Sequence, residues 1–552
     1  MNHTISRRAL LAAATSTAAL KAQAIPPVQD IVKRHDDAIA RLLKTQDTNP
    51  SSRWRGILPD EFGLHNPATA CGIISALATA YLHPASKYYH DAELVLRMKL
   101  AAGLLAREIT PDGNLDNPIT NFNSPPDTAF GVRAMCTGAV LAQRQGERDL
   151  LAIMEPFLKK AGASLTRGGI HTPNHRWVVC AALSQLHEVF GEPGYVRRID
   201  QWLAEGIDID ADGMYDERST VQYNPIVDSA LVVIAGKLKR PELLDYVRRN
   251  LDAMMYFLHP GYEVVTEISR RQDLNQRGDM GGYWFPLHYM AIHDNNGRYM
   301  TLSKHFAPTH APLSAFMEYP ELNAAGPKPE PVPDQYEKRM EVLDLVRIRR
   351  GATSASIFTK GNSRFFTLRR GEAVINAVRF ASAFFGKAQF VPEKAESNDG
   401  VHHLTQSLEA PYYQPFSPAR KIAAGEWTPT QKLRPQSEVC HFQQSASITE
   451  TKTGFRVRVQ ADGTKNVPVT IEINFREGGK LEGVVPMHKI ENGWALASGK
   501  CTYRMGSDTI SFGPARHEHS FVQMRGALPK LSGPSVYLTG FTPFDHTIEF
   551  EF

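Results

Sequence analysis

Two polar clusters in the first half of the chain carry side chains that could perform acid–base chemistry on an anionic substrate. In the first cluster, Asn174 and His175 follow directly after Pro173. Because proline suits the first turn of a helix, this spacing places Asn174 and His175 near a helix N-terminus. Such an end attracts anions, including the carboxylate of an acidic sugar. The alternative is an asparagine that caps the helix beside a surface histidine.

The second cluster is the polar run Asp212–Pro225, which contains Glu217 and Tyr223. Catalytic groups often lie on loops that a rigid scaffold positions. A free phenol has a pKa of about 10 and is a poor base, but cationic neighbours lower that pKa. We predict Tyr223 as a proton-transferring group and Glu217 as a substrate contact. The alternative is that Tyr223 packs at the start of a helix.

A third cluster, Glu267–Asp273, contains the neighbouring arginines Arg270 and Arg271. Guanidinium groups bind carboxylates and sulfates through paired hydrogen bonds, so Arg270 is a candidate catalytic residue and Arg271 a candidate substrate contact. The alternative is a solvated surface on which these arginines pair with Glu267 and Asp273.

Weaker candidates for sugar contacts come from a proline-rich loop and from tryptophan. Asn121 and Asn123 lie in that loop, where their amides can reach sugar hydroxyls. Trp177 can stack on a sugar face, although packing in the core is the commoner role of tryptophan.

The metal-binding patterns of the chain are incomplete. Asp208–Gly213 matches the first half of an EF-hand calcium loop, but Ser219 stands where that loop needs a glutamate. His517 and His519 would share one face of a strand, yet no third ligand is evident. We therefore predict neither a metal nor a cofactor.

The elements that position these residues are helical from residue 28 to 320. Hydrophobic residues recur at helical spacing in segments that come in pairs. These segments are Val28–Gln46, Pro67–Tyr81, Ala92–Glu108, Ala129–Arg144, Leu150–Ala163, Asn174–Val189, Val196–Ala204, Pro225–Lys237, Pro241–Phe257 and Tyr283–Ile292. Paired helices in this number favour a closed α/α toroid or an open solenoid.

After a proline-rich linker, residues 321–344, the hydrophobic period changes to two, which is typical of strands. The clearest strands are Leu345–Arg350, Ala355–Lys360, Arg364–Arg370, Ala373–Phe380, Phe455–Val459, Val467–Phe475, Thr509–Phe512 and Thr547–Phe552. We therefore predict a multidomain α-then-β protein: a toroid of paired helices at 28–320, then an antiparallel β-sandwich at 345–552.

The first 24 residues are typical of a signal peptide. Arg7 and Arg8 precede a short apolar run, and Ala22-Gln23-Ala24 suits cleavage. The paired arginines favour a twin-arginine signal, with an ordinary secretory signal as the alternative. No later stretch is apolar enough to span a membrane, so we expect a soluble mature protein in the periplasm or outside the cell.

Composition narrows the class of partner. The chain has 552 residues, 42% of them hydrophobic, and a net charge of +4 without a basic block, which argues against nucleic-acid binding. The five cysteines show no metal spacing. A Cys440–Cys501 disulfide stays open, and the sequence makes no prediction of oligomeric state.

The order and separation of the Asn174-His175 pair and the Asp212–Tyr223 run, DG-x-x-x-E-x-S-x-x-x-Y, resemble the heparinase II/III-like polysaccharide lyases. That resemblance implies a toroid followed by a β-sandwich, and an enzyme that cleaves a uronic-acid-containing polysaccharide by β-elimination. It also implies that Asn174 and His175 neutralise the uronate, that Tyr223 moves the proton and that Arg270 adds positive charge. Arg176 and Trp177 depart from the small residues that often follow in relatives.

Two other functions compete with a lyase. A glycoside hydrolase on the same scaffold would use carboxylates such as Asp127, Asp212, Asp216 or Glu217 as acid and base. A glycan-binding protein without turnover is the third possibility, and it would be indifferent to the loss of the Tyr223 hydroxyl.

Overall fold

The computed structural model describes residues 27–552, so the predicted signal peptide lies outside the described residues. The chain forms two compact units. The first, the helical unit, contains the described residues up to 209 together with 215–251 and 279–332. The second, the strand unit, contains residues 210–214, 252–278 and 333–552. The chain therefore passes from one unit to the other five times.

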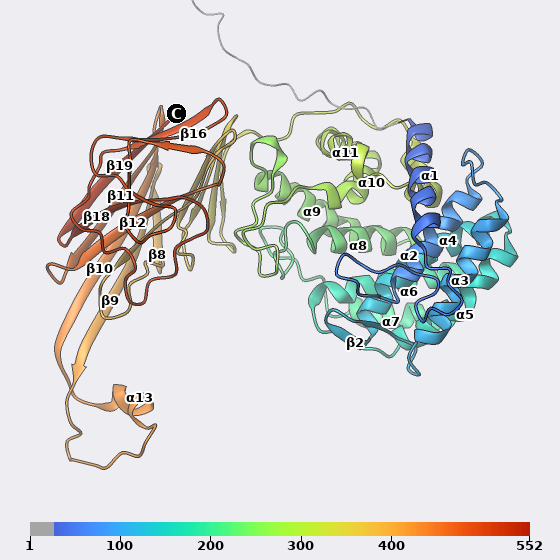
Figure 1. Cartoon of the computed structure of the whole chain (residues 1–552), viewed down its shortest axis with the longest axis horizontal. Helices are drawn as coiled ribbons and strands as arrows, with labels where there is room; N and C mark the ends of the chain where they lie inside the picture. The colour runs from blue at the N-terminus through green and yellow to red at the C-terminus, as the bar shows by residue number, and fades with distance from the viewer. Residues whose placement is uncertain (1–26) are drawn as a thin grey trace, which may run out of the picture. The chain divides into compact units, whose positions relative to one another are not determined.

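Twelve α-helices lie between residues 28 and 318 (Figure 1). They are α1 Val28–Thr45, α2 Thr69–Leu82, α3 Ala92–Glu108, α4 Pro125–Gln145, α5 Arg148–Leu165, α6 Pro173–Phe190, α7 Pro193–Leu203, α8 Asn224–Leu238, α9 Leu244–Met254, α10 Trp284–His293, α11 Gly297–His310 and α12 Leu313–Glu318. A small hairpin of β1, Leu115–Asn117, and β2, Asn121–Ser124, precedes α4. The last helical turn of the helical unit ends at Asn323, and a short helix, α13 Trp427–Thr430, lies in the strand unit.

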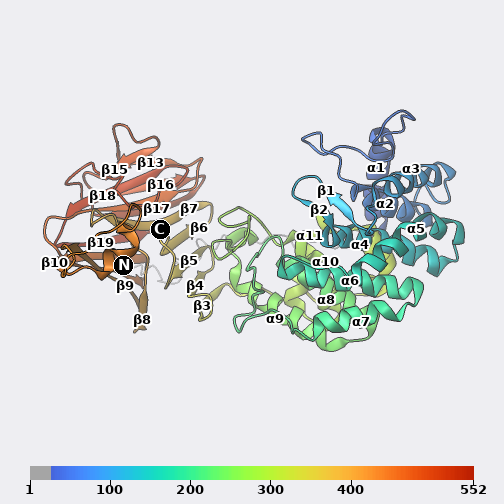
Figure 2. The same cartoon turned by 90° about the horizontal axis from the view of Figure 1, so that it is seen from below.

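The helices of the first unit form a ring of two layers (Figure 2). Successive inner helices α2, α4, α6 and α8 pack against one another, and α10 packs against α8. The outer helices α3, α5 and α7 pack on the inner helix that precedes or follows them. Because α12 packs on α1, α2 and α4, the end of the unit returns to its start. The predicted order of a helical toroid before a strand domain is confirmed.

One buried carboxylate joins the inner helices where the ring closes. Glu318, at the end of α12, accepts hydrogen bonds from Thr137 Oγ1 of α4 at 2.7 Å and Gln185 Nε2 of α6 at 3.2 Å. Lys237 Nζ of α8 lies 2.8 Å from the same carboxylate, and both of these side chains are almost fully buried. Glu318 therefore links three inner helices to the last helix of the ring.

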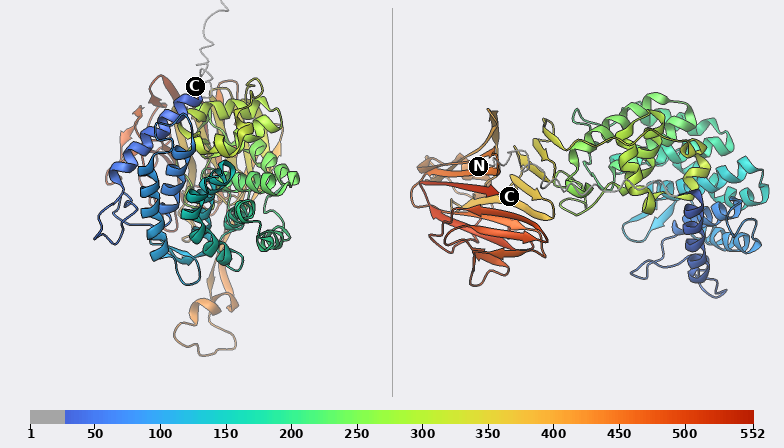
Figure 3. Two further views of the ribbon diagram at one scale, coloured as in Figure 1. Left: turned by 90° about the vertical axis from the view of Figure 1, so that its right-hand side faces the viewer. Right: turned by 90° about the horizontal axis from the view of Figure 1, so that it is seen from above.

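The strand unit contains two antiparallel layers (Figure 3). The nine-stranded sheet, in the order β14-β15-β18-β12-β7-β6-β5-β4-β3, is made of Val485–Pro486, Gly493–Ala495, Ser535–Phe541, Pro468–Phe475, Ala373–Ser382, Phe366–Arg370, Thr353–Phe358, Leu345–Arg350 and Gln335–Met340. The eight-stranded sheet, in the order β13-β16-β17-β19-β11-β10-β9-β8, is made of Lys480–Glu482, Cys501–Met505, Asp508–Gly513, Phe544–Glu551, Gly454–Gly463, Gln436–Glu450, Val401–Tyr413 and Lys394–Asn398. Among the strands of the described chain, β15 and β18 form the one parallel pair.

A single apolar core holds the two sheets together. Valine, isoleucine, leucine and phenylalanine side chains from both sheets fill it, among them Ile357, Phe366 and Phe380 of the larger sheet and Ile448 and Phe550 of the smaller one. Alternating side chains of a strand point to opposite faces, so the residues between these core positions face outward.

The outer face of the nine-stranded sheet is buried although it is polar. Residues 252–278 of the same unit cover it. Arg347 Nε donates to Tyr256 O at 3.2 Å, Arg349 Nη1 donates to Leu258 O at 3.1 Å, and a ring nitrogen of His259 lies 2.8 Å from a serine hydroxyl of β5. A buried polar face is unusual and points to a role beyond packing.

The structure corrects one sequence prediction and decides one cysteine pairing that the sequence left open. The linker is shorter than predicted, because β3 lies inside residues 321–344. A Cys440–Cys501 disulfide is excluded: β17, β19 and β11 separate their strands, so the two are roughly 19 Å apart at ordinary strand spacing. Within residues 27–552, no helix has the length and apolar character that crossing a bilayer requires.

We predict that Glu318→Gln destabilises the protein by roughly 1–3 kcal/mol, because it removes one of the two carboxylates that pair with the buried Lys237 ammonium and leaves Glu188 as the remaining one. Chemical denaturation monitored by circular dichroism measures this change. The matched control is Glu321→Gln, an exposed carboxylate three residues further along, which should shift the free energy of unfolding by less than about 0.5 kcal/mol. Equal stability of the two variants would contradict the role of Glu318.

Candidate active site

The inner helices of the ring begin at one end of the helical unit. α4, α6 and α8 are successive inner helices that outer helices connect, so the three run in the same direction. Each has a proline in its first turn: Pro125, Pro173 and Pro225. The free N–H groups of these first turns give that end of the ring a partial positive charge, which favours an anionic ligand.

Asn174 lies in the first turn of α6 and is almost fully buried. Its Nδ2 donates to Glu217 Oε2 at 2.6 Å and to Thr172 Oγ1 at 3.1 Å, while its backbone N–H donates to the same Glu217 oxygen at 3.1 Å. Its Oδ1 has no hydrogen-bond partner within residues 27–552. The carboxylate of Glu217 therefore sets the amide orientation, since rotation would bring Oδ1 against a negative charge.

This contact also brings the predicted second cluster to the first. Glu217 belongs to the loop that precedes α8, and it bonds to the start of α6. That Glu217 contacts substrate stays a prediction. The structure adds a second role, support of Asn174, which the sequence did not reveal. Glu217 is a buried acceptor that holds Asn174 in place.

His175 is mostly buried beside Asn174 and packs against two aromatic rings. The ring of His171 meets it edge-on at a centroid distance of 4.7 Å, and Phe130 of α4 does so at 6.2 Å. Sequence reasoning missed both neighbours. His171 directly precedes the Thr172–His175 motif, so its position was a usable signal, whereas Phe130 is near only through the packing of α4 on α6.

Tyr223 immediately precedes α8 and is half-buried. Its backbone N–H donates to Ser219 Oγ at 3.1 Å. The neighbouring Thr220 carbonyl accepts from the buried Tyr283 hydroxyl at 2.7 Å, which ties the loop to the segment before α10. The loop that carries Tyr223 is therefore held at both the α6 and the α10 side of the ring.

The two predicted asparagines at the start of α4 differ in their surroundings. Asn121 Nδ2 donates to Asp127 Oδ2 at 2.8 Å, in the first turn of α4. Asn123 is held by its own loop, since its amide donates to Asp112 at 2.7 Å and its Oδ1 accepts from Thr110 at 2.7 Å. Asn121 lies at the end of the ring where α4 begins, and Asn123 stabilises the turn before it.

The structure places Trp177, a predicted substrate contact, inside the core of the helical unit. Its side chain is completely buried, and its indole N–H donates to Asp208 Oδ1 at 2.8 Å. Arg176 lies over the ring at 4.7 Å and pairs with the same carboxylate at 2.9 Å. Trp177 therefore belongs to the core, which is the commoner place for this residue type.

Arg270 and Arg271 belong to the strand unit, on the loop of residues 266–277. Arg270 is exposed and Arg271 is half-buried. Two hydrogen bonds shape the loop. The Ser269 hydroxyl donates to the Asp273 carboxylate, and the backbone N–H of Arg271 donates to Ser269 Oγ at 3.1 Å. The structure thus assembles Asn174, His175, Glu217 and the Tyr223 loop in one unit and carries the two arginines in the other.

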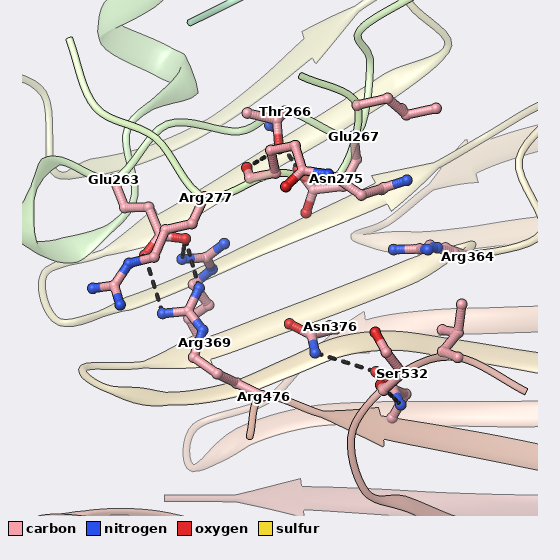
Figure 4. A pocket seen from close by; sticks show the side chains of 14 residues that line it. Glu263, Thr266, Glu267, Asn275, Arg277, Arg364, Arg369, Asn376, Arg476 and Ser532 are labelled. Atoms are coloured by element: carbon pink, nitrogen blue, oxygen red, sulfur yellow. Dashed lines mark hydrogen bonds and ion pairs between the residues drawn. The ribbon is translucent and has the colours of Figure 1, made fainter. Parts of the chain in front are cut away.

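The same strand unit contains a polar cavity of about 420 Å³ between the 263–277 segment and the outer face of the nine-stranded sheet (Figure 4). Glu263 anchors the segment there. Its carboxylate lies 2.6 Å from Arg369 Nη1, 2.6 Å from Arg476 Nη2 and 3.3 Å from Arg277 Nε. Burial raises the pKa of Glu263, but Arg369 and Arg476 outweigh burial, and the net pKa is lowered.

Two neighbouring histidines of the strand unit each form a hydrogen bond to a different serine. His402 and His403 each lie within 2.9 Å of a serine hydroxyl, those of Ser397 and Ser447. Over the described range, residues 27–552, no three side chains of histidine, cysteine, aspartate or glutamate gather as metal ligands do.

Comparison with known proteins identifies the fold. No family model and no curated protein matches the sequence. Among solved structures, the chain is similar to the Streptomyces coelicolor A3 chondroitin AC lyase in complex with chondroitin sulphate, with a TM-score of 0.54 and 12% identity over 95% of this chain and 79% of that one. It is also similar to a Paenibacillus xanthan lyase, with a TM-score of 0.55 and 10% identity over 88% of this chain. The chain spans about half, 51%, of that lyase. The predicted polysaccharide-lyase fold is confirmed.

We predict that the Glu263 cluster makes the protein lose stability in acid. The pKa of Glu263 is lowered from 4.5, so its contribution is complete above the unfolded pKa and disappears as the pH falls through the folded one. Denaturant unfolding between about pH 6 and about pH 3 should show a shallower decline in Glu263→Gln than in the wild type. Glu341→Gln, which changes an exposed glutamate of the same unit, should keep the wild-type slope. The same slope in Glu263→Gln would refute the prediction.

Proposed function

We propose that the chain is a polysaccharide lyase that cleaves a uronic-acid-containing glycan by β-elimination. The observation that carries this proposal is the buried Asn174 amide, which Glu217 orients in the first turn of α6 beside His175. A lyase needs such a group because the C5 proton of a uronate is removed only when the charge that develops on its carboxyl group is stabilised.

The first step is neutralisation of the substrate carboxyl group. Both N–H groups of the Asn174 amide are engaged, and its Oδ1 is the atom without a partner in the described chain. Neutralisation of the ionised uronate therefore requires one amide N–H of Asn174 to exchange its Thr172 partner for the substrate carboxylate, to which it then donates a hydrogen bond. The start of α6 and the His175 imidazole would stabilise the extra charge as the proton leaves C5.

The second step is transfer of the proton and loss of the leaving group. The Tyr223 phenolate, or His175 for the opposite C5 epimer, takes the C5 proton. The electron pair of the C5–H bond forms the C4=C5 double bond, and the C4–O4 bond breaks. O4 receives a proton from the Tyr223 phenol and leaves as the hydroxyl of the neighbouring sugar. Tyr223 is half-buried, so neighbouring residues hold its side chain while part of it stays exposed to a substrate.

The contacts of the carboxylates favour a lyase over a hydrolase. Asp127 accepts from Asn117, Asn121 and Ser124, which occupies both of its oxygens. Asp212 Oδ2 accepts two backbone N–H groups, and Glu217 supports Asn174. A hydrolase needs one carboxylic acid and one carboxylate that face the glycosidic bond, and three of the four candidates, Asp127, Asp212 and Glu217, have structural partners instead.

Substrate class and location extend the proposal. The fold neighbours act on acidic polysaccharides according to their names, which supports an anionic polysaccharide as substrate. We propose export through the Arg7-Arg8 segment and action in the periplasm or outside the cell. Substitution of both arginines by lysine should trap the precursor inside the cell if the signal is of the twin-arginine type.

We predict that the purified protein produces new ultraviolet absorbance on a uronate polysaccharide, because elimination leaves a double bond conjugated to the carboxyl group. Tyr223→Phe should lower kcat by roughly 10²–10⁴-fold and leave binding of the polysaccharide nearly unchanged. Tyr246→Phe, at a half-buried tyrosine of α9, is the matched control and should retain full activity. Reducing ends that form without absorbance would indicate a hydrolase, and binding without either product would indicate a glycan-binding protein.

We predict that Asn174→Asp lowers kcat/KM by about 10²–10³-fold. The new carboxyl group would stand 2.6 Å from Glu217 in place of the amide and repel an acidic substrate. Because the introduced carboxyl group ionises as the pH rises, the loss should deepen with pH, which a mere loss of folding would not do. The control is Asn295→Asp on the exposed loop after α10. Activity of Asn174→Asp that matches this control would remove Asn174 from the mechanism.

A further inference from the structure

We propose that the cavity on the outer face of the nine-stranded sheet is an oxoanion-binding site, centred on Arg364, that takes a sulfate-type or carboxylate group. The site is lined by residues of the strand unit, and none of these lining residues belongs to the helix-end cluster that carries the proposed chemistry. A free inorganic anion and an acidic group on a sugar would both present such an oxoanion to the site.

The charge of the cavity lining carries the first part of the argument. Four arginines line the cavity, namely Arg277, Arg364, Arg369 and Arg476, against the two carboxylates of Glu263 and Glu267. The lining therefore has a surplus of two positive charges. This field reaches the neighbouring His259, whose pKa is lowered well below 6.5 by burial and then by Arg369. Solvent screens the charge of the exposed Arg277, whereas Arg364 is half-buried and Arg369 is buried, and an anion stabilises positive charge in such places.

Arg364 is the arginine with a free guanidinium. Arg277, Arg369 and Arg476 all pair with Glu263, whereas the Arg364 guanidinium has no hydrogen bond or ion pair to any residue from 27 to 552. It lies apart from the Glu263 cluster, at the other side of the cavity (Figure 4). Burial lowers its pKa, with Glu267 as a partial compensation. A desolvated guanidinium of this kind binds oxoanions through paired hydrogen bonds.

One neutral donor, the amide of Asn376, also lines the cavity. Asn474 Nδ2 donates to Ser532 O at 2.9 Å and Ser535 Oγ at 3.0 Å, which leaves its Oδ1 to accept from Asn376 Nδ2 at 3.2 Å. The amide orientation of Asn376 is thereby set, and no residue from 27 to 552 accepts its second N–H. The volume of about 420 Å³ exceeds that of one small anion and lies in the range of small-molecule sites, so an acidic sugar also has room.

The test is calorimetric titration of the full-length mature chain with sodium sulfate, with sodium chloride at equal ionic strength as the reference. The wild type should bind sulfate, and Arg364→Gln should weaken binding by at least about tenfold. Arg277→Gln is the matched control: this arginine lines the same cavity but is exposed and paired, so its loss should change the affinity less than about threefold. Equal affinities of wild type and Arg364→Gln would overturn the proposal.

Two further arms keep the result decisive. If Arg364→Gln does not fold, Asn376→Asp introduces a negative charge into the cavity and should abolish sulfate binding.

Titration with glucuronic acid and with a sulfated monosaccharide identifies the source of the anion. Tighter binding than that of free sulfate indicates a sugar, and equal binding indicates the ion alone. No binding of any of the three would reject the site. Tyr223→Phe should bind sulfate as the wild type does, so failure of the proposed lyase activity leaves this test unaffected.

Discussion

The closure of the helical ring depends on one buried carboxylate. Glu318 is the last residue of α12, and it accepts from Thr137 and Gln185 and pairs with Lys237. Its partners lie on α4, α6 and α8, the helices whose first turns form the candidate active site. A buried charge is retained only when its partners satisfy it, so the geometry of these three helices is mutually dependent. The shared interaction lies beyond the middle of each helix and therefore fixes their packing away from the first turns, which Glu217 and the Tyr223 loop connect.

Buried glutamates serve the same purpose at two other places. Glu217 joins the loop before α8 to the first turn of α6, and Glu263 joins the 263–277 segment to the outer face of the sheet. Each is a single acceptor that several donors share, which restricts a loop more strongly than apolar contacts do because hydrogen bonds require direction as well as distance. Catalytic and binding groups on these loops are therefore held by carboxylates that take no part in the proposed chemistry themselves.

Local patterns predicted those elements whose start and end are encoded in a few neighbouring residues. Pro173 opens α6 and Gly191, with a positive φ, ends it, so the helix was predicted within a residue or two. The long strands β9 and β10 were missed because polar residues, among them His402, Gln406 and Gln444, occupy buried positions where the strand pattern calls for hydrophobic ones. Likewise α11 contains Pro308, which argues against a helix. At the site, the spacing of residues in the sequence was enough to select Asn174, His175 and Tyr223 as candidates. The anchoring role of Glu217 and the burial of Trp177 depend on contacts between distant segments, which spacing does not reveal.

The path of the chain has a consequence for how this architecture can be divided. Because the polypeptide alternates between the two units five times, no single cut separates them. A truncation after residue 332 would remove the strands and leave residues 252–278 with their polar side uncovered, while a fragment that starts at 333 would lack the layer that shields Arg347. Chimaeras made by exchanging contiguous halves of the chain with a structural neighbour would therefore contain segments that are separated from the unit on which they pack. Inheritance of the whole arrangement as one piece is the simpler evolutionary route.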